Sequence, residues 1–252
     1  QTCALPIYKP TLIKYIAAVV WVISSYACSP NNVTIDTSIA KMMDSASVVG
    51  SFALLENGSG KFTISQLSHY KDTASSPLGS FFILPALMAL DKGIIHQDQA
   101  TGLSMDSSSY FQNLITQLGR QEILKYIDSI HYGKGVVSAD MSKFWNDGSL
   151  KITADEQLGL IKRLYFKELP FQKRSQEIFK KIIIRQSNSN YTLSYVNAID
   201  PSSQQSWVLG YEEENTHIYF FVLHITSATK PYNAVDLLNK ILYQQGFLQG
   251  LR

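Results

Sequence analysis

Runs of apolar residues between turn signals occur in two separate parts of the chain and predict strands in both. Residues 48–55 form a mostly apolar run, and Asn57-Gly58 is a strong hairpin turn into residues 61–64. Three further strand-like runs lie near the C-terminus, at residues 191–196, 206–211 and 218–225. We therefore expect an early strand pair and a later block of three antiparallel strands.

The middle of the chain has apolar residues at the three-to-four-residue spacing of helices. Residues 111–118 and 122–127 carry this spacing, and Gly119 separates them. Thr153, followed three residues later by Glu156, predicts a capped helix start, and that helix is expected to run through Leu164.

A closing helix is expected from about Ala234 to Gln245, after the strand block. The order of elements is thus a strand pair, a helical middle, a block of strands and a last helix. This order predicts an α+β fold, with an antiparallel β-sheet flanked by helices and an inserted helical lobe.

Composition indicates a sizeable core and excludes some functions. Of the 252 residues, 45% are hydrophobic and 12% are aromatic, which suits one large domain or a two-lobed one. The formal net charge is only +2 and the basic residues form no long stripe, so nucleic acid is not expected as a partner.

The first 28 residues have the pattern of an export leader. Lys14 precedes an apolar run at residues 15–23, which is shorter than the roughly 20 residues of a membrane span. Small residues then lead to Ala27-Cys28, which resembles a bacterial lipoprotein processing site with Cys28 as the lipidated residue. An uncleaved signal anchor is the alternative. Residues 1–8 sit awkwardly ahead of such a leader and are treated as a candidate non-native scar.

These features divide the chain into a leader (1–28), a linker (29–45) and a domain (46–252). Under either interpretation of the leader the domain lies outside the cytoplasm. We expect an exported bacterial protein, either periplasmic or an outer-membrane-anchored lipoprotein, that touches the membrane only through its lipid anchor or signal segment.

The sequence predicts neither a metal nor a cofactor. Cys28 stands at the edge of the domain, and Cys3 falls in the excluded segment, so no disulfide is expected within the mature domain. The histidines show no close pair at helical ligand spacing; they are His69, His96, His131, His217 and His224.

One segment carries a resemblance to a known family. Ser76-Pro77-Leu78-Gly79-Ser80-Phe81-Phe82-Ile83, followed by an apolar helix, resembles the stretch that class D β-lactamases and penicillin-binding proteins build around Ser-x-x-Lys. On this alignment the nucleophilic serine falls on Gly79 and the lysine on Phe82. Glycine has no side-chain oxygen and phenylalanine holds no proton, so neither catalytic role survives. Taken alone, the segment could equally be a loop that leads into a core helix.

Further segments match the same family in order, over roughly residues 48 to 250. Phe144 to Thr153 resembles its Phe-Trp-x-x-Gly-x-Leu-x-Ile-Ser stretch, and Trp207 to Tyr211 resembles its Gly-Trp-Leu-x-Gly-Trp strand. Tyr132-Gly133-Lys134 stands where class D enzymes have Tyr-Gly-Asn. The resemblance therefore implies the penicillin-recognising fold.

The other catalytic positions of that family also differ here. The Ser-x-Val motif falls on Asp106-Ser107-Ser108, and a one-residue gap would put its serine on Ser107. The Lys-Ser/Thr-Gly strand motif aligns with Leu193-Ser194-Tyr195, where only the hydroxyl of Ser194 remains. The arginine that helps to hold the substrate carboxylate aligns approximately with Ala234.

Three serines are alternatives to the missing nucleophile. Ser80 could present its hydroxyl near the pocket after one residue of slippage, although Ile83 three residues on is no base. The strings Ser68 to Lys71 and Ser227 to Lys230 have the Ser-x-x-Lys spacing, but we expect both outside helices, where the two side chains do not meet reliably.

In the class D enzymes, the tryptophan that matches Trp145 shelters the lysine. With Phe82 in the lysine's place, we expect the two rings to pack together.

Two functions remain open. The first is a non-hydrolytic envelope protein that binds cell-wall peptide, glycan or a partner protein. The second is an active serine hydrolase or transpeptidase with a displaced nucleophile such as Ser80. A third function, that of a covalent penicillin sensor, is not expected, because acylation by penicillin needs the same serine and lysine as hydrolysis.

Overall fold

The computed structural model describes residues 32–96, 108–227 and 232–250. The chain separates into two units, 1–32 and 33–252, and the described helices and strands belong to the second unit. Cys28 and the rest of the leader lie outside the described residues, as do Asp106, Ser107 and Lys230.

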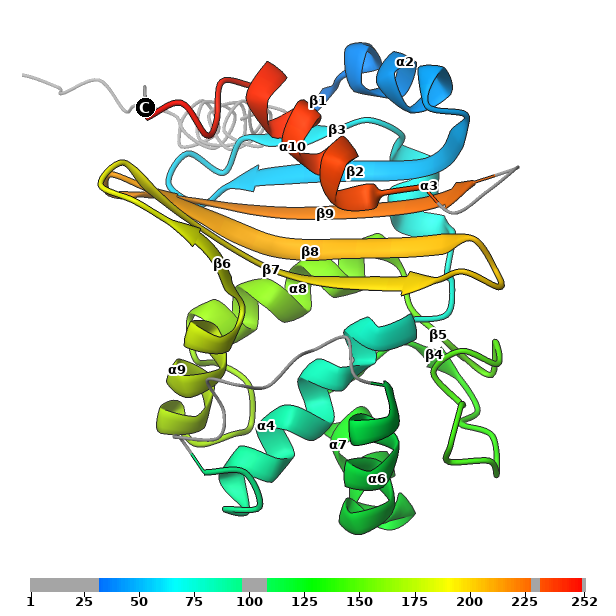
Figure 1. Cartoon of the computed structure of the whole chain (residues 1–252). Coiled ribbons are helices and arrows are strands. Elements are labelled where there is room, and N and C mark those ends of the chain that lie inside the picture. The colour runs from blue at the N-terminus through cyan, green and yellow to red at the C-terminus, as the bar shows by residue number, and fades with distance from the viewer. Residues whose placement is uncertain (1–31, 97–107, 228–231, 251–252) are drawn as a thin grey trace, which may run out of the picture. The chain divides into compact units, whose positions relative to one another are not determined.

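A seven-stranded sheet with the order β1-β3-β2-β9-β8-β7-β6 forms the centre of this unit (Figure 1). Its neighbouring strands are antiparallel except β1 and β3, which are parallel. The strands are β1 (Val33–Ile35), β2 (Val48–Glu56), β3 (Phe62–Ile64), β6 (Ile184–Ser187), β7 (Tyr191–Asp200), β8 (Gln205–Glu214) and β9 (His217–Ser227). The predicted strands and the antiparallel sheet are confirmed.

Helices cover both faces of the sheet (Figure 1). One face carries the two helices nearest the ends of the described chain, α2 (Thr37–Ser45) and α10 (Ala234–Gln244). The helical lobe packs on the other face. It contains α4 (Ile83–Asp91), α6 (Ser108–Leu118), α7 (Arg120–Ile130), α8 (Ala154–Tyr165) and α9 (Lys173–Ile182). The inserted lobe expected from the sequence is therefore present.

The central strands are apolar on both faces because a core lies on each side. Phe52, Val208 and Phe221 face the core under α2 and α10, whereas Trp207, Leu209 and Val222 belong to the core under the lobe. A β-carbon at Gly210 would overlap the carbonyl oxygen of Ser194. Glycine is required there because the two strands approach so closely.

The helix from Ala154 begins as its sequence predicts. The Thr153 hydroxyl accepts from the Glu156 backbone N–H at 3.2 Å, and the Glu156 carboxylate accepts from the Thr153 N–H at 2.8 Å. This reciprocal capping box satisfies two backbone donors that the first turn of a helix leaves without partners.

Residues 33–45 are not the linker that we expected. They form β1 and α2, and Ile39 and Met43 of α2 are buried against the sheet. Asp36 caps the helix by accepting from the Ser38 N–H at 2.8 Å. The helix is short, and the core that Ile39 and Met43 enter comes from strands far along the chain, so local periodicity gave little sign of it.

The expectation that Ser68 and Lys71 lie outside a helix is also wrong. Both are in the short helix α3 (Leu67–Asp72), and both are exposed, away from the η1 segment. Ser227 ends β9, and its companion lysine lies outside the described residues.

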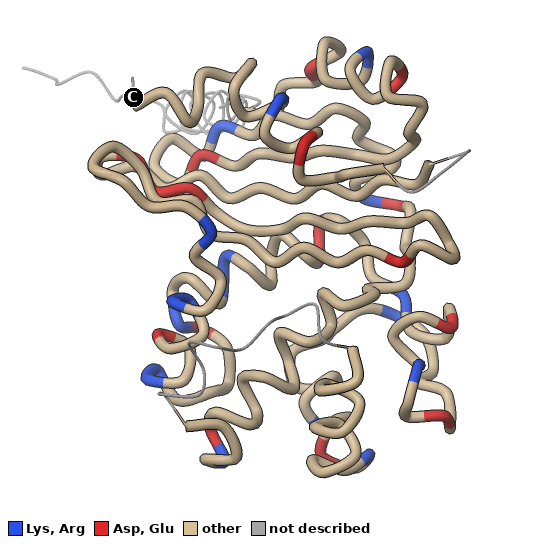
Figure 2. The backbone as a smooth tube through the Cα atoms, in the orientation of Figure 1, with Lys and Arg blue, Asp and Glu red and all other residues tan. Residues whose placement is uncertain are grey.

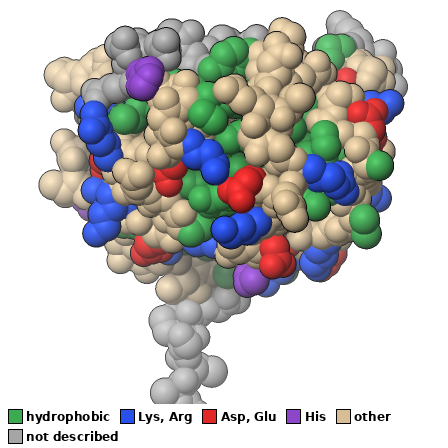
Figure 3. All heavy atoms as spheres, turned by 90° about the horizontal axis from the view of Figure 1, so that it is seen from below, with side chains coloured by type: hydrophobic (Ala, Val, Ile, Leu, Met, Phe, Trp, Pro, Cys, Tyr) green, Lys and Arg blue, Asp and Glu red, His purple; other side chains and the backbone are tan. Residues whose placement is uncertain are grey.

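Acidic and basic residues are interspersed along the described elements (Figure 2). The face of the unit seen from below mixes both charges with apolar side chains (Figure 3).

Candidate functional site

A cavity opens where the short 3-10 helix η1 (Leu78–Phe82) leads into α4. Its volume is about 310 Å³. We call it the η1 cavity. The residues that line it come from η1, α6, β7 and the loop before β5 (Leu150–Lys151), and they are Gly79, Phe82, Ser108, Trp145, Asn146, Asn197, Ala198 and Ile199. The structure thus brings together Gly79, Phe82, Ser108 and Trp145, which the sequence had singled out.

Gly79 leaves room for a side chain. A β-carbon built there would lie 3.5 Å from the Ala198 Cβ and 3.5 Å from the Phe82 ring, which is ordinary van der Waals contact. The residue does not have the positive φ that favours glycine. Neither the backbone conformation nor the packing therefore requires glycine at this position.

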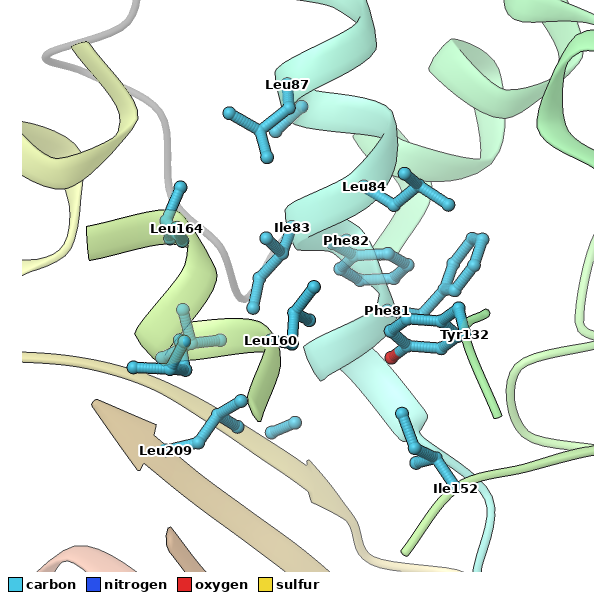
Figure 4. Packing of buried hydrophobic residues seen from close by; sticks show 14 of the residues in the cluster. Phe81, Phe82, Ile83, Leu84, Leu87, Tyr132, Ile152, Leu160, Leu164 and Leu209 are labelled. Carbon is cyan, nitrogen blue, oxygen red and sulfur yellow. The ribbon is translucent and has the colours of Figure 1, made fainter. Parts of the chain in front are cut away.

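Phe82 is buried within a cluster of aromatic rings. Its ring stacks on Phe111 with centroids 4.3 Å apart, and it meets Trp145 edge to face with centroids 5.4 Å apart and an interplanar angle of 71°. The predicted packing of Phe82 against Trp145 is confirmed. The neighbouring Phe81 packs against Tyr132, with ring centroids 5.6 Å apart (Figure 4).

Ser80 is fully buried and does not line the cavity. Its hydroxyl donates to the Pro77 carbonyl oxygen at 2.5 Å and accepts from the Gln157 side-chain amide at 2.6 Å. The first bond lies within the turn of η1, and the second holds η1 against α8. The hydroxyl therefore has a structural partner on each side rather than a base.

Lys134 and Tyr132 lie in a different place. They line a second groove of about 520 Å³, beside the small sheet of β4 (Lys134–Gly135) and β5 (Leu150–Lys151). Arg120 and His131 line the same groove. The buried hydroxyl of Tyr132 has its pKa raised by desolvation, so it stays protonated. The structure does not bring either residue to the η1 cavity.

The segment of β7 expected at the site, residues 193–195, does not line the η1 cavity. Leu193 and Tyr195 pack into the core under α10, and Ser194 is fully buried. The cavity wall instead comes from the next part of the strand, residues 197–199.

This part of β7 has an edge without a strand partner in the described chain. β6 pairs with β7 only up to the Tyr195 N–H, which donates to the Ile183 carbonyl oxygen. Backbone groups of alternate residues point to the same side of a strand, so those of Asn197 and Ile199 face the same way as those of Tyr195. Beyond Tyr195 that side lies beside the η1 cavity.

Four cavity residues were missed by sequence reasoning, namely Asn146, Asn197, Ala198 and Ile199. Asn146 could have been found, because it directly follows Trp145. The other three could be found only from the packing of β7 on η1. Of the remaining predicted positions, Ala234 is buried as the first residue of α10.

A buried histidine lies in the sheet away from the cavity. His224 is 3% exposed and stacks on Trp207 with ring centroids 4.0 Å apart. Burial lowers its pKa to about 3, with a smaller contribution from His69.

Within the described residues, no group of three His, Cys, Asp or Glu side chains is placed to hold a metal ion. In the same part of the chain, no helix has the length and apolar character of a membrane span.

Comparison with known proteins points to one group. The regulatory protein BlaR1 of Bacillus licheniformis is 29% identical over 231 residues, which are 81% of this chain and 38% of BlaR1. The chain thus spans well under half of that relative's length. Beta-lactamase OXA-5 of Pseudomonas aeruginosa is 25% identical over 94% of this chain and 99% of its own length.

A solved structure agrees with these relatives. The C-terminal domain of the Bacillus licheniformis BlaR penicillin-receptor superposes with a TM-score of 0.75 at 25% identity, over 85% of this chain and 96% of that domain. No family model matches the chain. Over most of its length the chain is thus similar in sequence and fold to class D β-lactamases and to a BlaR-type penicillin-receptor domain.

Proposed function

We propose that this chain is a non-hydrolytic member of its family, which keeps the η1 cavity for binding and has lost the reaction. The observation that carries the proposal is the pair Gly79 and Phe82. Both line the cavity at the positions where the resemblance expects serine and lysine. A phenyl ring packed on Phe111 and Trp145 fills the place of the base. Loss of a catalytic nucleophile and its base costs on the order of a million-fold in turnover.

The alternative, an active hydrolase with Ser80 as nucleophile, has less support. The Ser80 hydroxyl is buried, its proton is directed to Pro77 and its lone pair is engaged by Gln157. Ser108 lines the cavity, but the described lining residues include no histidine, lysine or carboxylate that could act as a base for its hydroxyl.

Of the possible ligands, namely cell-wall peptide, glycan or a partner protein, an extended peptide suits the cavity best. The backbone N–H and C=O groups of Asn197 and Ile199 face the open edge of β7 beside it. An extended chain can add to such an edge as another strand, with main-chain hydrogen bonds supplying affinity. On this proposal the family's strand motif corresponds to Val196-Asn197-Ala198, three residues beyond the alignment from sequence.

The open edge gives a direct test of peptide binding. A library of N-acetylated hexapeptide amides is incubated with the full chain, and retained peptides are identified by mass spectrometry. Ile199→Pro removes the outward N–H without removing a bond to β8, whereas the matched Ile199→Ala keeps that N–H. Retention that Ile199→Pro abolishes and Ile199→Ala preserves supports the proposal. Equal retention by both variants, or no retention by the parent chain, contradicts it.

For localisation, we propose that the chain is exported and lipidated at Cys28, because small residues precede that cysteine after a short apolar run. Expression in a bacterium, with fractionation and intact-mass measurement, tests this. The parent chain should be membrane-associated, begin at Cys28 and carry lipid, and Cys28→Ser should lose the lipid. Membrane association of an uncleaved Cys28→Ser chain would instead establish a signal anchor.

A further inference from the structure

A row of side chains crosses the sheet and ends at the η1 cavity. It consists of directly paired residues on four neighbouring strands, namely Ser51 (β2), His224 (β9), Trp207 (β8) and Ala198 (β7). Trp207 and Ala198 belong to the core under the helical lobe, so the row faces that side of the sheet. Ala198 lines the cavity, and its Cβ lies 3.5 Å from a β-carbon built on Gly79.

Trp207 connects this row to the segment that leads into η1. Its buried ring stacks on His224 with centroids 4.0 Å apart. Its indole Nε1 donates to the Ser76 carbonyl oxygen at 2.9 Å. Only Pro77 separates Ser76 from the first residue of η1, Leu78. The position of the Trp207 ring therefore fixes the chain where η1 begins.

Three buried polar atoms of this region have no hydrogen-bond partner among the described residues. They are the His224 Nε2, the Ser51 Oγ and the Nδ1 of His69, which lies in α3. Burial, and to a smaller extent His69, lowers the pKa of His224 to about 3. A proton on His224 would thus be a buried charge without a hydrogen-bond acceptor at Nε2.

The charged side chains of the surrounding elements do not balance such a proton in the described part of the chain. Those of α3 and α8 are Lys71, Asp72, Asp155, Glu156, Lys162 and Arg163. Asp155 accepts from the Tyr70 hydroxyl, and Glu156 caps its own helix. Those of β2, β8 and β9 lie at the end of these strands that is remote from His224, and they are Glu56, Glu212, Glu213, Glu214 and His217.

We infer that His224 is a pH-sensitive positioning residue for the η1 cavity, acting through Trp207 and Ser76. The neutral ring stays stacked on Trp207. A ring that takes up a proton must reach water, which parts it from Trp207 and releases the segment before η1. Because the opened state binds this proton more tightly than the closed state, opening becomes more favourable as the pH falls below 6.5. The inference does not depend on which ligand the cavity binds.

Hydrogen exchange of residues 73–82 in the full chain tests the inference. Two amides of this segment are protected by bonds to other segments, because the Ser75 N–H donates to the Ile152 carbonyl oxygen and the Leu78 N–H to the Trp145 carbonyl oxygen, both at 3.0 Å. Rates are corrected for the intrinsic effect of pH on exchange. Between about pH 7.5 and about pH 5.5 we expect the corrected rate to rise about tenfold.

Variants assign this rise to His224. His224→Phe and His224→Gln have no group that titrates in this range, so the rise should disappear in both. His217→Gln removes an exposed histidine of the same strand and should leave the rise unchanged. Trp207→Phe keeps a ring but lacks the indole N–H, so the segment should exchange faster than in the parent chain at both pH values.

Three results would overturn the inference. A corrected rate in the parent chain that does not change with pH would show that the segment opens without exposing His224. A rise that persists in His224→Phe and His224→Gln would assign the proton to another group. Exchange that a low concentration of urea accelerates would show that residues 73–82 open only in global unfolding, without a local connection between His224 and the cavity.

Discussion

The rings of Phe82 and Trp145 meet edge to face, with centroids 5.4 Å apart, at the place where the resemblance to class D enzymes expects a lysine beside a tryptophan. The apolar pair fills this part of the cavity wall, and Phe82 is only 3% exposed. Position 82 is therefore part of the hydrophobic core.

Placing the lysine of the family pattern at position 82 should therefore destabilise the fold. Phe82→Lys removes the contacts with Phe111 and Trp145 and places an ammonium among rings, so we expect a loss of about 3 kcal/mol or more in the free energy of unfolding. Phe82→Leu keeps an apolar side chain and should cost about 1–2 kcal/mol. Urea unfolding measures both. Equal stability of Phe82→Lys and the parent chain would show that the ring pair is not a structural element.

Gly79 should tolerate a β-carbon, unlike a glycine of the sheet. Gly79→Ala should change the free energy of unfolding by no more than about 1 kcal/mol, since the added atom makes ordinary contacts. Gly210→Ala should cost at least about 2 kcal/mol, because its β-carbon would overlap the Ser194 carbonyl oxygen. Thermal unfolding compares the two variants. A Gly79→Ala chain as unstable as Gly210→Ala would mean that packing, rather than loss of function, explains the glycine.

Ser80 should act as a structural residue. Ser80→Ala removes the hydroxyl that accepts from the buried Gln157 side-chain amide, which should cost about 1–3 kcal/mol. Ser108→Ala, at an exposed position of the same region, should change stability by no more than about 0.5 kcal/mol. Urea unfolding distinguishes them, and a neutral Ser80→Ala would refute the structural role.

Acid should weaken the fold through His224. Its pKa is about 3 in the folded chain, against 6.5 for an unperturbed histidine. Below pH 6.5 the unfolded state binds a proton that the folded state refuses, so stability falls as the pH drops from 6.5 towards 3, by up to about 1.4 kcal/mol per pH unit.

His224→Phe keeps a ring against Trp207 and removes this titration. Urea unfolding at several pH values should show a shallower loss of stability below pH 6.5 for the variant than for the parent chain. Parallel pH profiles would mean that His224 titrates in the folded state as it does when unfolded.

The main strands and most helices could be predicted because their signals are local. The alternating and apolar runs of β2, β8 and β9, and the Thr153 cap of α8, lie within a few residues of the elements that they specify. The helix α2 was missed because its buried residues, Ile39 and Met43, depend on a core formed by distant strands.

Part of the candidate site could be predicted, because that part also has a local sequence signal. Gly79, Phe82 and Trp145 lie in segments that match a family pattern, and the structure brings them together. The position along β7 was not found, because that strand has neither the lysine nor the glycine that would mark the motif. Its register follows only from pairing with β8 and from the contact of Ala198 with the Gly79 position.

Intact-mass spectrometry of the full chain after incubation with excess benzylpenicillin decides whether the cavity has been retained without the acylation reaction. We expect an unchanged protein mass at every time point, for the parent chain and for Gly79→Ser, which restores a hydroxyl without a base. A mass increase equal to one penicillin on the parent chain, lost in Ser80→Ala or Ser108→Ala, would refute the loss of the reaction and identify the nucleophile.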